Sequence, residues 1–261
     1  MHLYLSDRPH PSQGAFRPDL QEFCHELVAE RLTRPFPLTC VTGYPSESLR
    51  PVYHEIDKVF AANQDLHDYR EDFPWFSGFI GDIDSEVMLL AENPSLRGLK
   101  KASKLRRLQD FEMQWGVTSG DKILRKALVR AGLKDGPPMR RNGWHCYITN
   151  VVKMADVASE WSDRSEEDKF RIAKLFAPVL QEELRIMKPR VIVVMGKRVA
   201  SMFCRLRDEN VLEIPRPKSG NRIRIERVLH YAYFNNSGPK PKKKREFYNN
   251  FKRIGSLVPR N

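Results

Sequence analysis

From residue 86 onward, short runs of apolar residues alternate with longer segments whose apolar positions recur at helical spacing. The apolar runs predict strands at Val87–Ala91, Cys146–Thr149, Val191–Met195 and Ile223–Leu229. Strands that alternate with helices join through right-handed crossovers, so we expect parallel strands with helices on both faces. The pattern therefore predicts an α/β fold, a three-layer α/β/α sandwich with a central four-stranded parallel sheet.

The segments around these strands are amphipathic and predict helices at Ser119–Ala131, Glu166–Met187, Lys197–Leu206 and Lys242–Ile254. Ser119 is a candidate N-cap, since a serine hydroxyl accepts a hydrogen bond from a free backbone amide. The second helix ends before Pro189, which cannot continue it. Together with the strands, these helices predict a core domain over residues 86–261.

Residues 1–85 are predicted to form a mostly helical N-terminal extension packed on the core domain. Leu20–Leu32 is amphipathic, and a second helix is expected up to Leu66 that begins no earlier than Pro51. Phe73–Ile80 is aromatic and broken by proline and glycine. We interpret it as a loop that fills space against the core rather than as a binding surface.

Composition narrows the class of protein. Hydrophobic residues make up 41% of the 261 residues, which is enough for a packed core. No apolar run approaches the roughly 18–20 residues that cross a bilayer, and the first residues do not resemble a signal peptide. We therefore expect a cytoplasmic, monomeric protein without a membrane partner. Lys and Arg number 45 against 33 Asp and Glu, and this net charge of +12 is typical of proteins that bind nucleic acid.

Polar side chains follow each predicted strand. Glu92 and Asn93 follow the first strand, Asn150 the second, Lys197 the third and His230 the fourth. Ligands of parallel sheets bind outside the carboxyl ends of the strands, so we expect the functional site at this edge.

Gly196 and Lys197 alone do not make a phosphate-binding loop. Neither G-x-x-x-x-G-K-[ST] nor G-x-G-x-x-G is present, which argues against an enzyme with a nucleotide cofactor. Gly196 is interpreted as the tight turn between a strand and a helix.

The residues from Val87 to Asn236 resemble the uracil-DNA glycosylase superfamily. The likeness is clearest in Tyr147–Lys153 (YITNVVK) and Lys188–Lys197 (KPRVIVVMGK), which are similar to the bacterial and archaeal iron–sulfur members. The first motif of the family reads Gly-Glu-Ala-Pro-Gly or Gly-x-Asn-Pro-Gly, and Ala91–Ser95 (AENPS) fits both forms. The resemblance implies the family's α/β fold and cleavage of N-glycosidic bonds in DNA.

The resemblance also implies roles for single residues. Either Glu92 or Asn93 positions the water or offsets charge, and both assignments stay open. Asn150 matches the asparagine that reads the pyrimidine edge, and His230 matches the histidine of the last motif. An aromatic residue of the family stacks on the flipped base. Its first candidate here is Trp115 and its second is Phe111.

Two departures from the family bear on cofactor and substrate. The iron–sulfur members need four cysteines, and Met154 occupies one of those positions, so we predict no cluster, no other cofactor and no metal. The usual last motif His-Pro-Ser is replaced by His230-Tyr231-Ala232, which lacks the serine that holds a phosphate. The base therefore stays open between uracil and a bulky modified cytosine, such as phage DNA carries. The altered motif and the long insertion between Ser95 and Ser119 favour the second.

Basic residues follow both proposed catalytic motifs, which predicts contacts with DNA phosphates. The candidates, with Lys197 added, are Lys100, Lys101, Lys104, Lys240, Lys242, Lys243, Lys244 and Arg245. Tyr233 and Phe234 either wedge into the gap left by the flipped base or pack under their loop.

These observations predict a monofunctional DNA glycosylase that leaves an abasic site, in DNA repair or in anti-phage defence. A catalytically silent DNA-binding module on the same fold is the alternative. An RNA-processing enzyme or nucleotide hydrolase on a similar sheet is a third.

Overall fold

The computed structural model describes residues 47–63, 78–96, 115, 118–140, 142–218, 222–234 and 240–258. All of them belong to one compact unit, Gly43–Asn261, while the other unit, Met1–Thr42, lies outside the described residues. The predicted helix Leu20–Leu32 lies outside them as well, and so do Lys100, Lys101, Lys104 and Phe111.

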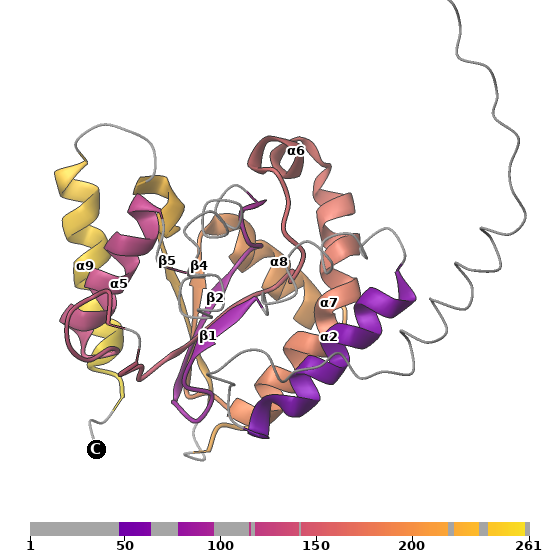
Figure 1. The fold of residues 1–261 in the computed structure, drawn as a ribbon, viewed down its shortest axis with the longest axis horizontal. Coiled ribbons are helices and arrows are strands. Elements are labelled where there is room, and N and C mark those ends of the chain that lie inside the picture. The colour runs from indigo at the N-terminus through magenta and orange to yellow at the C-terminus, as the bar shows by residue number, and fades with distance from the viewer. Residues whose placement is uncertain are drawn as a thin grey trace, which may run out of the picture. The chain divides into compact units, whose positions relative to one another are not determined.

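The described residues form one five-stranded sheet with the order β1-β3-β2-β4-β5. Its strands are β1 (Phe79–Gly81), β2 (Val87–Ala91), β3 (Tyr147–Asn150), β4 (Val191–Met195) and β5 (Arg224–Val228). The last four are parallel to one another, and β1 pairs antiparallel with β3 at one edge. The predicted α/β fold with four parallel strands is therefore confirmed (Figure 1).

Strand β1 is an addition that the sequence pattern does not predict, because its three residues are too short to show a strand period. Phe79 and Ile80 belong to the segment that we interpreted as a loop, and they are instead buried strand residues. Gly81 has a φ of +102°, and a Cβ there would overlap the carbonyl oxygen of Cys146. The sheet thus begins before the predicted domain boundary at residue 86.

Helices cover both faces of the sheet (Figure 1). One face carries α5 (Ser119–Ala131) and α9 (Pro241–Gly255), and the other carries α2 (Arg50–Ala62), α7 (Glu166–Met187) and α8 (Lys197–Asp208). The shorter elements are η2 (Glu47–Leu49), α6 (Ala158–Asp163) and η5 (Tyr231–Phe234). None of the described helices is long and apolar enough to cross a membrane.

Two helix starts differ in detail from the prediction. The N-cap of α5 is Thr118 rather than Ser119, because the Thr118 hydroxyl accepts from the Asp121 amide and the Asp121 carboxylate accepts from the Thr118 amide. Helix α2 begins at Arg50, and its Phe60 ring packs edge-on against Phe176 of α7 with 5.8 Å between ring centroids. This helix of the predicted extension therefore belongs to the same apolar core as the helices of the core domain.

Candidate active site

The carboxyl ends of the parallel strands meet at one edge of the sheet, since Ala91 pairs with Asn150 and Met195 pairs with Val228. A cavity of about 490 Å³ opens at this edge. Its lining contains Glu92, Glu166, Met195, Gly196, Lys197, Arg198, Val199, Ser201 and His230. Three residues predicted from strand ends, Glu92, Lys197 and His230, thus face one cavity.

Glu92 is held by donors from two other elements. Its Oε1 accepts a hydrogen bond from Trp161 Nε1 of α6 at 2.8 Å and another from Arg198 Nη1 of α8 at 3.2 Å. The second oxygen, Oε2, lies 3.4 Å from the same Arg198 nitrogen. The carboxylate side chain is 14% exposed, so it is largely enclosed yet open to the cavity.

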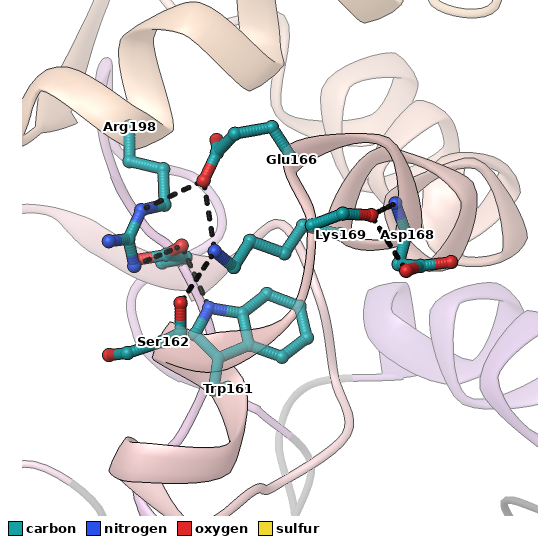
Figure 2. A network of polar contacts seen from close by, with 8 residues as sticks. Trp161, Ser162, Glu166, Asp168, Lys169 and Arg198 are labelled. Carbon is teal, nitrogen blue, oxygen red and sulfur yellow. Dashed lines mark hydrogen bonds and ion pairs between the residues drawn. The ribbon is translucent and has the colours of Figure 1, made fainter.

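A second carboxylate, Glu166 at the start of α7, also lines the cavity, and its side chain is 71% exposed. Arg198 and Lys169 both point toward it (Figure 2), with Lys169 Nζ at 2.9 Å and Arg198 Nε at 3.8 Å from Oε1. The hydrogen bond from Lys169 lowers the pKa of Glu166, so this carboxylate is ionised at neutral pH. Arg198 is therefore shared between two carboxylates from different parts of the chain.

His230 is fixed as a neutral imidazole. Its Nδ1 accepts a hydrogen bond from the Ala232 amide at 3.1 Å, which leaves the proton on Nε2. The ring stacks on Tyr231 with 4.6 Å between centroids. Burial, and next the positive charge of Arg198, lower the pKa of His230 from 6.5 to about 4. At neutral pH the imidazole therefore offers an N–H donor without carrying charge.

Asn150 lies at the end of β3, but it does not line the cavity. The side chain is 1% exposed, and its Nδ2 donates to the Gly78 carbonyl at 3.0 Å. Its Oδ1 is buried and has no hydrogen-bond partner among the residues that the structure describes. A buried acceptor left unpaired costs about 1–3 kcal/mol, so this oxygen is available to an incoming donor.

A buried polar cluster underlies Asn150. Lys153 Nζ pairs with the Glu183 carboxylate at 2.8 Å, and both side chains are at most 1% exposed. The hydroxyls of Tyr147 and Thr149 each donate to Glu183 Oε1 at 2.8 Å. Burial lowers the pKa of Lys153, and the Glu183 carboxylate opposes that shift. The cluster fixes the strand that ends in Asn150.

Asn93 and Trp115 do not line the cavity that Glu92 and His230 share. Asn93 is half-buried and does not line the cavity. Trp115 is buried, and its Nε1 donates to the Tyr231 hydroxyl at 3.0 Å. Its indole therefore supports, from behind, the ring on which His230 stacks.

The two aromatic residues after His230 divide between surface and core. Tyr233 is 41% exposed, whereas Phe234 is buried and packs against the Phe247 ring of α9 at 5.3 Å. Lys240 lies over the Tyr233 ring at 3.9 Å and donates to its carbonyl oxygen. Only Tyr233 of this pair is placed to meet a ligand.

The basic run at the start of α9 is on the surface. Lys242, Lys243 and Arg245 are exposed, Lys244 is half-buried, and the first turn has no acidic residue. Cations at a helix N-terminus face the positive end of the helix dipole. These cations therefore destabilise the helix slightly. Their exposure at one helix end would suit contacts with DNA phosphates.

Three residues of the site escape the sequence reasoning: Trp161, Glu166 and Arg198. Trp161 and Glu166 belong to α6 and α7, which do not follow a strand directly, so the strand-end argument does not reach them. Arg198 does follow β4, but the sequence shows no feature that would select Arg198 over the neighbouring cation Lys197 as the site residue. Their contacts with Glu92 and with one another appear only once the helices are packed.

The described residues do not fit the iron–sulfur cluster of the bacterial and archaeal members that the sequence resembles. Met154, at the position of a cluster cysteine, is 2% exposed and packed in the apolar core, and a thioether cannot supply a thiolate ligand there. That the protein binds no cluster stays a prediction.

The fold and this edge of the sheet define an α/β protein with a carboxylate, an imidazole and cationic side chains around one cavity. Residues 78–252 match the family model described as "Uracil DNA glycosylase superfamily", and the chain belongs to this superfamily. The match begins at residue 78, next to β1. A search of curated proteins found no match to the chain.

Proposed function

We propose that this protein is a monofunctional DNA glycosylase that flips a non-standard pyrimidine out of DNA and hydrolyses its N-glycosidic bond. The proposal rests on one observation above all. The enclosed carboxylate of Glu92 and the neutral imidazole of His230 line the same cavity at the edge where such sheets bind ligands.

The chemistry divides between these two groups. The bond between C1′ and the base nitrogen breaks, its electron pair leaves with the base, and positive charge develops on the sugar. Glu92 offsets that charge, orients the attacking water and takes its proton as the water oxygen bonds to C1′. His230 Nε2–H donates a hydrogen bond to a base oxygen and stabilises the departing anion. Glu92 suits the water-positioning role better than Asn93, because Asn93 does not line the cavity.

Asn150 supports recognition of a pyrimidine. Asn150 does not line the cavity, so its Oδ1 can accept from an N–H group of the base only if the base reaches the buried end of β3, where the Gly78 carbonyl holds the amide in one orientation. Flipping a base costs a few kcal/mol, and satisfying this buried oxygen offsets part of that cost.

The size of the cavity favours a modified base over uracil. Its volume of about 490 Å³ lies within the roughly 300–1,000 Å³ range of ligand sites, so the cavity has room for a base that carries an added group. We therefore propose a bulky modified cytosine, such as phage DNA carries, as the substrate and anti-phage defence as the role. Uracil excision in repair is the competing version.

The test compares base release from unmodified duplex, uracil-containing duplex and phage DNA with hypermodified cytosine. Free base is measured by mass spectrometry, and abasic sites by strand breaks that require alkali. Glu92→Gln and His230→Gln should each lose release, by about 100-fold or more for the histidine. Glu160→Gln and His54→Gln, which replace exposed residues away from the cavity, serve as matched controls. Salt-dependent DNA binding without base release from any substrate would instead identify a silent DNA-binding module.

A further inference from the structure

Arg198 lies in the first turn of α8, on the wall of the cavity that Glu92 and His230 also line. Its guanidinium contacts two carboxylates from different parts of the chain, and the contact with Glu166 is visible in Figure 2. Nη1 contacts both oxygens of Glu92 at 3.2 and 3.4 Å, and Nε lies 3.8 Å from Glu166. Its side chain remains 39% exposed. Arg198 therefore contacts Glu92 directly and lines the same cavity as His230.

The position of Arg198 is unfavourable for the helix itself. The first turn of α8 contains Lys197 and Arg198 and no acidic residue, and its N-cap is Gly196, which has no side chain to accept from the free amides. Cations there oppose the helix dipole by a few tenths of a kcal/mol or more. The compensating carboxylates come from outside the helix, from Glu92 and Glu166. Residues that break a local rule in this way are expected at functional sites.

We propose that Arg198 is a positioning residue of the glycosylase site, which holds Glu92 in the orientation that bond cleavage needs and shares the cavity wall with His230. The inference rests on the proposed function, because it assigns a role within that reaction.

The effect on Glu92 is geometric. Trp161 and Arg198 both donate to Oε1 from elements that are packed on the core, so the carboxylate cannot rotate freely. Oε1 accepts from two donors and Oε2 makes one longer contact of 3.4 Å, so Oε2 keeps more capacity to accept from a water. Pre-orienting this group removes a rotational cost from the reaction.

The effect on His230 is electrostatic. The charged or titratable side chains of the cavity are Glu92 after β2, Glu166 of α7, and Lys197 and Arg198 of α8, and Tyr231 of η5 stacks on the ring. Of these side chains, Arg198 is the one whose charge lowers the pKa of His230, in addition to burial. A neutral imidazole is the form whose Nδ1 accepts from the Ala232 amide while Nε2 donates to the base.

The experiment compares Arg198→Gln, which removes the charge, with Arg198→Lys, which keeps the charge and loses the forked geometry. Arg205→Gln is the matched control, because it removes the same charge from the same helix where Arg205 pairs with Glu167 and Glu209. The pKa of His230 is measured by NMR of labelled histidine, with the signal assigned through His230→Gln. This measurement needs no substrate.

In Arg198→Gln the pKa of His230 should rise above 4 without reaching 6.5, because burial remains. In Arg198→Lys it should stay nearer the wild-type value. On a substrate that wild type cleaves, both variants should lose about 100-fold in kcat, since the carboxylate is no longer held. The acidic limb of the pH–rate profile should move upward for Arg198→Gln alone. Arg205→Gln should match wild type in each measurement.

Two results would overturn the inference. One is an unchanged His230 pKa together with an unchanged kcat in Arg198→Gln. The other is a variant that loses only DNA affinity, which would make Arg198 a phosphate contact. If wild type releases no base, the proposed function fails, and the NMR titration still reports whether Arg198 governs His230.

Discussion

Gly196 and His230 are in close contact at the carboxyl edge of the sheet. A Cβ at position 196 would lie 3.1 Å from the Cβ of His230, and Gly196 has a φ of +105°, which side chains rarely adopt. Its amide also donates to the Val228 carbonyl at 2.8 Å, which joins the ends of β4 and β5. Glycine at this position therefore sets both the turn into α8 and the place of the imidazole.

Replacing Gly196 with alanine should both strain the turn and displace His230. We expect a loss of about 1–3 kcal/mol in the free energy of unfolding, measured in urea, since an unfavourable φ is imposed on alanine. The pKa of His230 should rise in the same variant, because a displaced ring is less buried. A variant that keeps both wild-type values would contradict this account of the turn.

The stability of the folded protein should depend on the protonation of His230. The folded pKa of about 4 lies below the ordinary 6.5, so between these pH values the unfolded chain binds a proton that the folded protein excludes. Stability should therefore fall as the pH decreases from about 6.5 to about 4. In His230→Gln this part of the pH dependence should disappear, whereas His54→Gln, at an exposed position on α2, should retain it. Urea titrations across this pH range make the comparison.

The buried pair Lys153 and Glu183 should be sensitive to the loss of either partner. Glu183→Gln leaves the Lys153 ammonium buried without a counter-charge, which typically costs about 3–5 kcal/mol. The double variant Lys153→Met/Glu183→Leu should be less destabilised than Glu183→Gln, although the hydroxyls of Tyr147 and Thr149 then lose their acceptor. Equal stability of Glu183→Gln and wild type would mean that the pair is not ionised.

Trp115 and Tyr231 offer a double-mutant cycle. Trp115→Phe keeps an aromatic ring and loses the hydrogen bond to the Tyr231 hydroxyl, and Tyr231→Phe loses the same bond from the other side. Each should cost about 1 kcal/mol, and the double variant should cost less than the sum of the two. Additive losses in the double variant would contradict a direct hydrogen bond between the two side chains.

Neutralising the basic run of α9 should weaken DNA binding before it alters chemistry. Changing Lys242, Lys243, Lys244 and Arg245 to glutamine should reduce the slope of log K against log salt by about 0.9 for each phosphate that the protein no longer neutralises. Single-turnover cleavage at saturating protein should stay close to wild type. Four basic residues of α2 and α7, Arg50, Lys58, Arg171 and Lys174, provide a control with the same change of charge.

The sequence predicts the parts of this protein that follow from strand periodicity. The apolar runs locate β2, β3 and β4 closely, and the edge where Glu92 and His230 meet follows from the parallel order. Strand β1 is not predicted because its three residues, the last of which is a glycine, are too few to show a strand period. Helix α6 is not predicted because its six residues make less than two helical turns. Arg198 could not be found from the sequence, since its role depends on how the fold brings α8 close to Glu92 and Glu166.

Strand β1 forms one edge of the five-stranded sheet and covers β3. Because β1 pairs with β3, the amide and carbonyl groups of Phe79–Gly81 and not those of Tyr147–Asn150 form the outer border. A variant that lacks only Gly78–Gly81 would keep every parallel strand and leave β3 as an open edge, ready to pair with another molecule. It would also lose the Gly78 carbonyl that orients Asn150. Solubility and base recognition would then be lost together, through one short segment that precedes every proposed reacting group.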